Sequence, residues 1–89
     1  MQNPDIARIF GEVADLLEIQ GENPFRVRAY RNAARTIGDT PDPLADRVRE
    51  GAVLPELSGI GADLAEKIST IVKKGSLPLH SQLVKKLSP

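Results

Sequence analysis

The fold of this chain is decided by the stretch Leu57-Ser58-Gly59-Ile60-Gly61-Ala62-Asp63-Leu64-Ala65-Glu66-Lys67-Ile68. Two glycines flank one apolar residue, and a helical pattern begins directly afterwards. Because glycine adopts positive φ angles readily, Gly59 and Gly61 predict a sharp turn between two short helices. The second helix begins with free N–H groups, which suit a phosphate. The pattern predicts a helix–hairpin–helix motif over about residues 53–74, although such hairpins also occur without a ligand.

Length and composition predict one small domain over residues 1–89. The sequence has no cysteine and one histidine, His80, which excludes a disulfide framework, a thiolate metal site, a cysteine nucleophile and a multi-histidine site. His80 itself is expected to be a solvated surface residue. No apolar run reaches the roughly 20 residues of a membrane span, and the N-terminus lacks the pattern of a signal peptide. We therefore expect a cytoplasmic protein with no membrane contact.

The formal net charge is zero, with 12 basic and 12 acidic side chains, but the charges alternate in blocks. Residues 1–23 are mainly acidic and residues 24–36 carry four arginines without an acid. From residue 67 onward the charged side chains are all lysines. A fold that joined the two basic blocks would have one positive face suited to nucleic acid. The alternative is that the blocks are ordinary solvated helix faces.

Hydrophobic periodicity predicts an all-α bundle of five or six short helices. Two start signals, Asn3-Pro4 and Asn23-Pro24, place a capping residue before a proline, and Gly21 and Gly38 mark the corresponding ends. The apolar face of the first helix is expected to comprise Ile6, Ile9, Phe10, Val13, Leu16 and Leu17, and that of the second Phe25, Ala29, Tyr30, Ala33, Ala34 and Ile37.

Four further helices are predicted beyond Asp39-Thr40-Pro41-Asp42-Pro43, which forms a turn. They cover residues 44–50, residues 53–57 as the brief first helix of the hairpin, residues from about 62 to Gly75, and a last helix from about Pro78. The apolar residues expected to cover the core from the last two helices are Leu64, Ala65, Ile68, Ile71, Val72, Leu79, Leu83, Val84 and Leu87.

Two motifs in this order resemble the small N-terminal domain of family X DNA polymerases, the family of DNA polymerase beta, and particularly its bacterial members. They are residues 21–35, which read Gly-Glu-Asn-Pro-Phe-Arg-Val-Arg-Ala-Tyr-Arg-Asn-Ala-Ala-Arg, and the hairpin of residues 57–68. The resemblance implies a compact SAM-like helical domain that binds gapped or nicked duplex DNA at a 5′-phosphate during base excision repair. Because the sequence offers no nucleotidyl-transfer site, two alternatives stay open: an N-terminal domain of a longer enzyme with a polymerase core, or a free-standing protein of the same fold.

Carried over residue by residue, the resemblance places Arg26 and Tyr30 at the 5′-phosphate and Lys67 at the Schiff-base position of a 5′-deoxyribose phosphate lyase. Arg26 and Tyr30 are four residues apart and therefore neighbours on one helix face, whereas Arg28, Arg31 and Arg35 lie on the opposite face. The candidate DNA-binding set comprises Arg26, Tyr30, Arg31, Gly59, Ile60, Gly61, Ala62 and Lys67.

The lyase reaction requires a neutral amine at Lys67, because only that form attacks the sugar aldehyde. Asp63 stands four residues earlier on the same face, at a position that is commonly basic in the family, and Glu66 is adjacent. A salt bridge from Asp63 would hold Lys67 protonated. Ser58 also replaces the usual proline of the hairpin. The sequence therefore favours a structural or phosphate-contacting role for Lys67 over that of the lyase nucleophile.

The resemblance implies a monovalent cation, K⁺ or Na⁺, on the main-chain carbonyls of Pro55, Leu57 and Ile60. A cation there would bridge the backbone to a DNA phosphate, so binding would be independent of base sequence. We expect a monomer. A protein-interaction module of the same fold is the alternative, with a docking surface formed by Leu79, Leu83 and Leu87; we expect these leucines to cover the core instead.

Overall fold

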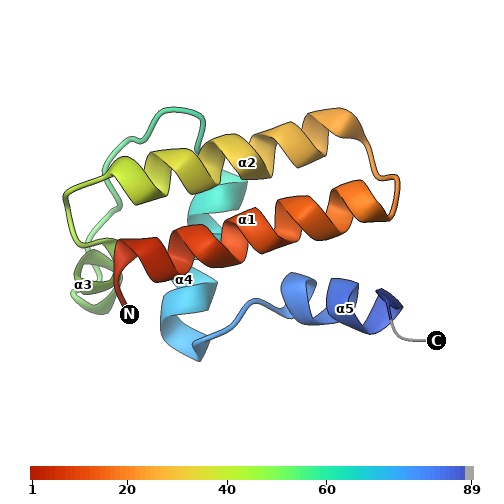
Figure 1. Ribbon diagram of the computed structural model, residues 1–89. Helices are drawn as coiled ribbons and strands as arrows, with labels where there is room; N and C mark the ends of the chain where they lie inside the picture. The colour runs from red at the N-terminus through yellow and green to blue at the C-terminus, as the bar shows by residue number, and fades with distance from the viewer. Residues whose placement is uncertain (88–89) are drawn as a thin grey trace.

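The computed structural model describes residues 1–87, and these residues form five helices and no β-strand. The expected all-α class and the helix–hairpin–helix arrangement are confirmed. Figure 1 shows the order of the helices along the chain. They are α1 (Asn3–Ile19), α2 (Pro24–Asp39), α3 (Leu44–Arg49), α4 (Ala62–Lys74) and α5 (Pro78–Leu87).

The core lies between α1, α2 and the two C-terminal helices. Helices α1 and α2 run antiparallel side by side, α5 lies along the other side of α1, and α4 crosses beneath the pair (Figure 1). The rings of Phe10 and Tyr30 meet at the centre, with centroids 5.7 Å apart and planes tilted by 46°, a favourable geometry for an aromatic pair. The fully buried large side chains around them are Ile6, Val13, Leu17, Ile37, Leu44, Ile68 and Ile71.

The buried face of α2 differs at its N-terminal end from the one expected. Phe25 is 75% exposed and Ala29 is also exposed, whereas Val27 is 7% exposed and faces the core. The buried stripe runs from Val27 through Tyr30 to Ile37 at helical spacing. Phe25 precedes Val27 by two residues, which is a rotation of about 200° around a helix. The prediction was wrong for Phe25 and Ala29. Apolar residues lie on two neighbouring faces of the first turns of α2, so the sequence pattern did not decide which face is buried.

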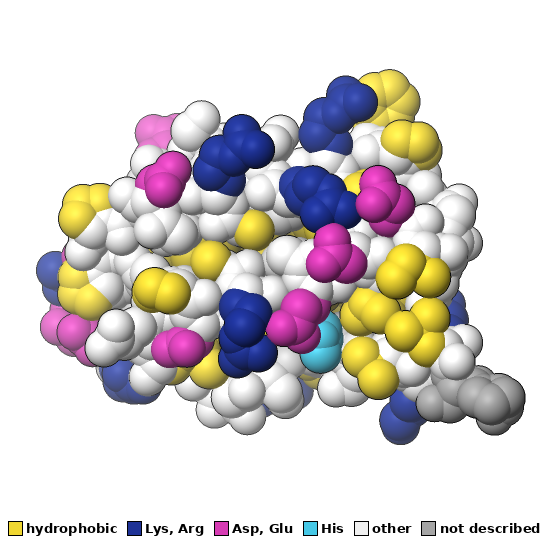
Figure 2. Space-filling model, in the orientation of Figure 1, with side chains coloured by type: hydrophobic (Ala, Val, Ile, Leu, Met, Phe, Trp, Pro, Cys, Tyr) yellow, Lys and Arg dark blue, Asp and Glu magenta, His cyan; other side chains and the backbone are white. Residues whose placement is uncertain are grey.

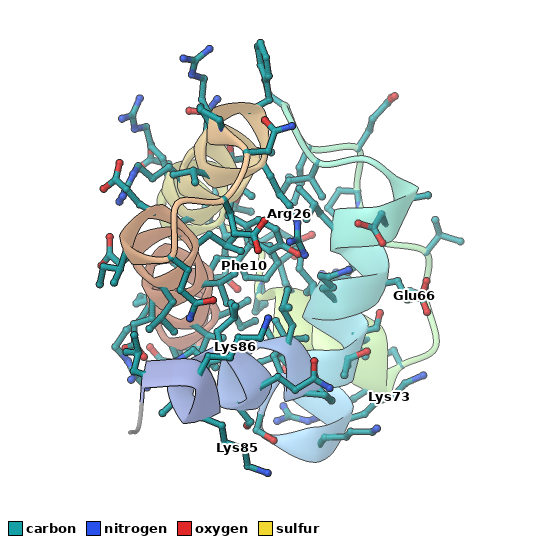
Figure 3. All side chains as sticks on the ribbon, turned by 90° about the vertical axis from the view of Figure 1, so that its right-hand side faces the viewer. Phe10, Arg26, Glu66, Lys73, Lys85 and Lys86 are labelled. Atoms are coloured by element: carbon teal, nitrogen blue, oxygen red, sulfur yellow. The ribbon has the colours of Figure 1, made fainter. Side chains whose placement is uncertain are left out.

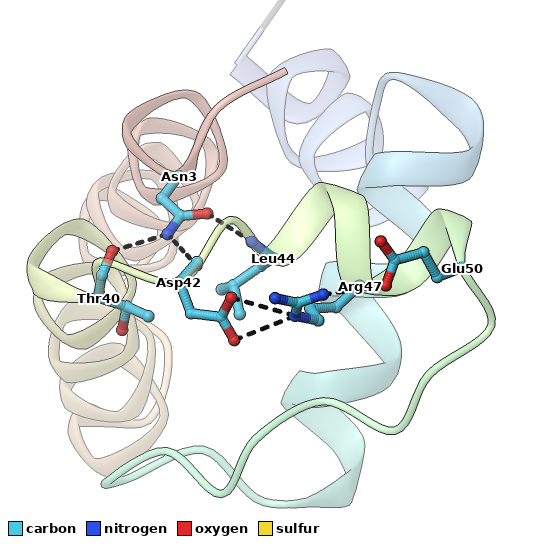
Figure 4. A network of polar contacts seen from close by, with 6 residues as sticks. All are labelled: Asn3, Thr40, Asp42, Leu44, Arg47 and Glu50. Carbon is cyan, nitrogen blue, oxygen red and sulfur yellow. Dashed lines mark hydrogen bonds and ion pairs between the residues drawn. The ribbon is translucent and has the colours of Figure 1, made fainter.

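The sequence predicted Asn3 as the N-cap of α1, and this prediction was wrong. Asn3 is the first residue of the helix and is 8% exposed. Its Nδ2 donates to the carbonyl oxygens of Thr40 and Asp42, each at 2.8 Å, and its Oδ1 accepts from the N–H of Leu44 at 3.0 Å. Figure 4 shows this network, which continues through the ion pair of Arg47 with Asp42. Asn3 thus joins α1 to the turn between α2 and α3.

The segment 53–57 forms no helix, contrary to expectation. Five residues offer too few hydrogen bonds to offset the cost of helix nucleation, and Pro55 contributes no N–H donor. Helix α3 ends at Arg49, and Gly51 follows its C-cap Glu50 with a φ of +72°, which suits glycine. Helix α3 packs against α4, and residues 53–57 lead from it to the hairpin turn without helical structure.

Helix α5 is attached to α1 by two polar contacts and one buried leucine. The Nε2 atom of His80 lies 2.8 Å from Oε1 of Glu12, and Gln20 Nε2 donates to the carbonyl of Leu83 at 3.0 Å. The side chain of Leu83 is 3% exposed. His80 is therefore a docking residue rather than the solvated side chain expected. Val84 and Leu87 are 43% and 49% exposed, so the expectation that they cover the core was wrong.

Candidate functional site

The hairpin turn is closed by a hydrogen bond of 3.1 Å from the N–H of Ile60 to the carbonyl of Leu57. Gly59 has a φ of +77°, as predicted. Gly61 does not share this conformation, since its φ of −86° and ψ of −173° are extended and it occupies the N-cap of α4. The turn therefore requires glycine at position 59, while any residue tolerated at an N-cap fits the backbone at position 61.

The N-terminus of α4 presents free backbone donors. No side chain caps it, and among residues 1–87 the N–H groups of Ala62, Asp63 and Leu64 donate to no protein acceptor. The helix dipole adds partial positive charge at this end. The Asp63 carboxylate lies in the same first turn and is 80% exposed. These N–H groups therefore suit an anion that binds next to the Asp63 carboxylate or moves this exposed side chain aside.

Lys67 lies one turn further along α4, with its Nζ 3.1 Å from Oδ1 of Asp63. Its side chain is only 24% exposed. Burial by itself lowers the pKa of Lys67, but the hydrogen bond that Lys67 donates to Asp63 and the nearby Tyr30 and Asp63 oxygens outweigh burial and raise the pKa above its ordinary value. The raised pKa favours the ammonium form of Lys67, which can pair with an anion.

Tyr30 links the two sequence motifs. Its ring is buried against Phe10, and its side chain lies close enough to Lys67 to contribute to the raised pKa of that lysine. Arg26 lies one turn before Tyr30 on α2, and Figure 3 shows its side chain extending from α2 toward α4. Within residues 1–87, Arg26 pairs with no carboxylate. The fold thus brings Arg26, Tyr30 and Lys67 to one side of the molecule.

Arg31 lies on the other side of α2 and is ion-paired with α1. Its guanidinium contacts Asp15 at 2.8 Å and Glu18 at 3.1 Å. The hydrogen bond to Asp15 is the main cause of a raised pKa at Arg31. Figure 2 shows basic and acidic side chains interspersed over α1 and α2. On this face the expectation of an ordinary solvated helix surface fits better than that of a positive face.

The C-terminal lysines are spread along the molecule rather than gathered beside the arginines. Figure 3 shows Lys73 and Lys85 at the far end of α4 and on the outer side of α5, away from Arg26. Within the described chain, Lys67 is the lysine that the fold brings to α2. The labelled lysines Lys73 and Lys85 therefore do not join Arg26 in one positive cluster.

The three carbonyl oxygens expected to hold a monovalent cation lie in the hairpin and just before it. Leu57 and Ile60 stand opposite each other as an isolated β-bridge. The Leu57 oxygen accepts the hydrogen bond of the Ile60 N–H, and the Pro55 oxygen accepts none from the backbone of residues 1–87 outside regular helix bonds. Carbonyl oxygens are the ligands that K⁺ prefers in proteins. The binding of K⁺ or Na⁺ by these three oxygens stays a prediction.

The described residues contain neither a cluster of metal ligands nor a helix suited to span a membrane. No group of three or more His, Cys, Asp or Glu side chains between residues 1 and 87 is placed to hold a metal ion. None of the five helices combines the length and the apolar composition that crossing a membrane requires.

The sequence matches the family model described as "Helix-hairpin-helix domain" over residues 1–77. The chain belongs to this helix–hairpin–helix domain family. It is also 30% identical over 87 residues to the DNA polymerase/3′-5′ exonuclease PolX of Bacillus subtilis (strain 168). That match covers 98% of this chain but 15% of the relative. The resemblance to the helix–hairpin–helix domain of family X DNA polymerases is therefore confirmed. The chain corresponds to a small part of the length of that relative.

Proposed function

We propose that this helix–hairpin–helix domain binds DNA through its phosphates, without reading base sequence, in the context of a family X-like enzyme. The observation that carries the proposal is the meeting of Arg26, Tyr30 and Lys67 beside a helix N-terminus with free donors. The relative named a DNA polymerase supplies the context. The proposed contacts are to backbone phosphates, which carry no information on base sequence.

The preferred ligand in this proposal is a gapped or nicked duplex with a 5′-phosphate. Within residues 1–87 Arg26 pairs with no carboxylate, so its guanidinium can form a charge-assisted pair with the terminal phosphate. Lys67 supplies a second positive charge, and its exposed partner Asp63 restrains it weakly. The dianionic charge of a terminal phosphate favours it over an internal phosphodiester at such a site.

The hairpin contributes backbone donors and the cation ligands. The N–H groups of Gly59, Gly61 and Ala62 would approach a neighbouring phosphate of the same strand. A K⁺ or Na⁺ ion on the carbonyls of Pro55, Leu57 and Ile60 would supply positive charge beside that phosphate. No polymerase activity is proposed for these residues, and Lys67 is proposed to bind rather than to cleave.

The experiment is a titration of the protein with a one-nucleotide-gapped duplex, with and without a 5′-phosphate in the gap, at two salt concentrations. Amide NMR shifts locate the contacts. We expect shifts at Arg26, Tyr30 and residues 59–67, tighter binding of the phosphorylated duplex, and weaker binding at higher salt because counterions compete. An absence of shifts at low salt would refute DNA binding, and equal affinity for both duplexes would refute recognition of the 5′-phosphate.

Two arginine variants make a matched pair for this titration. Arg26→Gln and Arg35→Gln each remove one charge from α2, and neither arginine pairs with a carboxylate within residues 1–87. The two positions lie on opposite faces of the helix. We expect Arg26→Gln to weaken binding about tenfold and to reduce the salt dependence by about one phosphate contact, while Arg35→Gln changes affinity less than twofold. Equal losses would indicate only long-range attraction.

A protein-interaction role is the second candidate, and exposed apolar side chains support it. Ile19 at the end of α1 is 67% exposed, and Val84 and Leu87 on α5 are also exposed. Figure 2 shows hydrophobic side chains gathered over this end of the molecule. Binding through this surface would respond little to salt, in contrast to DNA binding. The two salt concentrations of the titration therefore separate the two roles.

A further inference from the structure

One side chain outside the candidate site holds the hairpin against α2. The hydroxyl of Thr36 donates to the carbonyl of Ser58 at 3.0 Å. Within residues 1–87, this is the one hydrogen bond between residues 53–61 and the side chain of another element. The hairpin is otherwise held by the partly buried side chains of Leu54, Leu57 and Ile60. In the described part of the chain, Thr36 therefore provides the one hydrogen bond that relates the hairpin to the helix of Arg26 and Tyr30.

The contact acts on the central peptide bond of the hairpin turn. A φ of +77° at Gly59, the third residue of the turn, corresponds to a type II turn. Type I and type II turns differ by a flip of the central peptide, which here carries the Ser58 carbonyl and the Gly59 N–H. A donor placed at the Ser58 oxygen therefore selects the type II orientation.

The direction of the Ser58 carbonyl also fixes the direction of the Gly59 N–H. The peptide bonds of the chain are trans, so the N–H points opposite to the carbonyl. Because Thr36 holds the carbonyl toward α2, the Gly59 N–H points away from α2. In the described residues this N–H donates to no protein acceptor. Gly59 is exposed, so the group is available to a ligand.

We infer that Thr36 is a positioning residue for phosphate binding, which orients the Gly59 N–H outward and sets the hairpin in register with α2. The inference rests on the proposed function for its ligand, a DNA phosphate, but the effect on the turn is independent of DNA. Thr36 touches no ligand itself. A threonine in the middle of a helix gives no sequence signal for this role.

The test compares Thr36→Val, which keeps the shape and removes the donor, with Thr36→Ser, which keeps the donor. Amide exchange at Ile60 reports the closed turn, and the three-bond H–N coupling at Gly59 reports its φ. Loss of one such hydrogen bond corresponds to about fivefold faster exchange at Ile60 and about fivefold weaker binding of the 5′-phosphorylated gapped duplex in Thr36→Val. Thr36→Ser is expected to match the wild type in both.

Each outcome decides a separate point. Unchanged exchange and coupling in Thr36→Val overturn the positioning role, whatever the affinity for DNA. A changed turn with unchanged affinity overturns the link to binding. If the wild type binds no DNA, the proposed function fails, while faster exchange at Ile60 in Thr36→Val still establishes that Thr36 orients the turn.

Discussion

The Nζ atom of Lys67 lies 3.1 Å from the Oδ1 atom of Asp63, one helical turn earlier on α4. This contact joins a lysine that the fold brings close to Tyr30 of α2 with an exposed carboxylate at the start of the same helix. It places two opposite charges at the entrance of the candidate site. The protonation state of Lys67 and its freedom to contact a phosphate both depend on this pair.

Substitution of Asp63 tests the pair directly. We expect Asp63→Asn to lower the pKa of Lys67, because burial lowers that pKa and the opposing hydrogen bond and charge of Asp63 are removed. An NMR titration of the Lys67 side-chain signals measures the change. Glu66→Gln is the control, since Glu66 is adjacent in sequence but does not pair with Lys67. Equal shifts in the two variants would contradict the role of Asp63.

The raised pKa of Lys67 predicts a dependence of stability on pH. A lysine whose pKa is higher in the folded state stabilises the fold fully below the pKa of the unfolded chain, about 10.4. This contribution is lost as the pH rises through the higher folded-state pKa. We therefore expect the stability difference between the wild type and Lys67→Met to be constant near neutral pH and to shrink above about pH 10.4. Urea unfolding at a series of pH values measures it.

Borohydride trapping tests whether Lys67 acts as a nucleophile. Only the neutral amine forms an imine with a sugar aldehyde, and the contact with Asp63 favours the ammonium form. With a gapped duplex that carries a 5′-deoxyribose phosphate, we expect little trapped adduct for the wild type at pH 7 and more for Asp63→Asn. Lys67→Arg is the negative control. Rapid trapping by the wild type would show that the lyase reaction proceeds despite the ion pair.

Asn3 is expected to be the most important polar side chain for stability. Asn3→Ala removes three hydrogen bonds and leaves the Leu44 N–H without its partner. A loss of about 2–3 kcal/mol in the free energy of unfolding is expected, because buried groups are left unsatisfied. Asn32→Ala, an exposed asparagine of α2, is the control and should change stability by less than about 0.5 kcal/mol. Urea denaturation measures both variants.

The orientation of α2 is tested by two apolar residues at its start. Val27 faces the core at 7% exposure and Phe25 faces solvent at 75%. We expect Val27→Ala to cost about 1–2.5 kcal/mol of stability through lost burial and cavity formation. Phe25→Ala should cost less than about 0.5 kcal/mol despite the larger side chain removed. A larger loss at Phe25 than at Val27 would mean that α2 is rotated relative to this structure.

Local sequence signals predicted the helices well where a cap and a periodic apolar face agreed. Asn23 caps α2, as its position before Pro24 predicted. Its side-chain oxygen accepts a hydrogen bond of 2.8 Å from the N–H of Phe25. Gly75 ends α4 with a φ of +75°. These features depend on neighbouring residues alone. The same signals at Asn3-Pro4 gave a wrong cap, because a contact with residues 40–44 outweighs the local preference of asparagine for an N-cap.

The sequence by itself determined the helical class, the glycine turn at Gly59 and the pairing of Asp63 with Lys67, because each depends on residues at most four positions apart. Only the tertiary structure decided which arginines form ion pairs and which do not within residues 1–87. Arg31 is paired with Asp15 and Glu18, while Arg26 is turned toward α4. It also brought Thr36 to Ser58 and Tyr30 to Lys67. Such contacts join distant segments, and the packing of α1, α2 and α4 around one core sets their geometry.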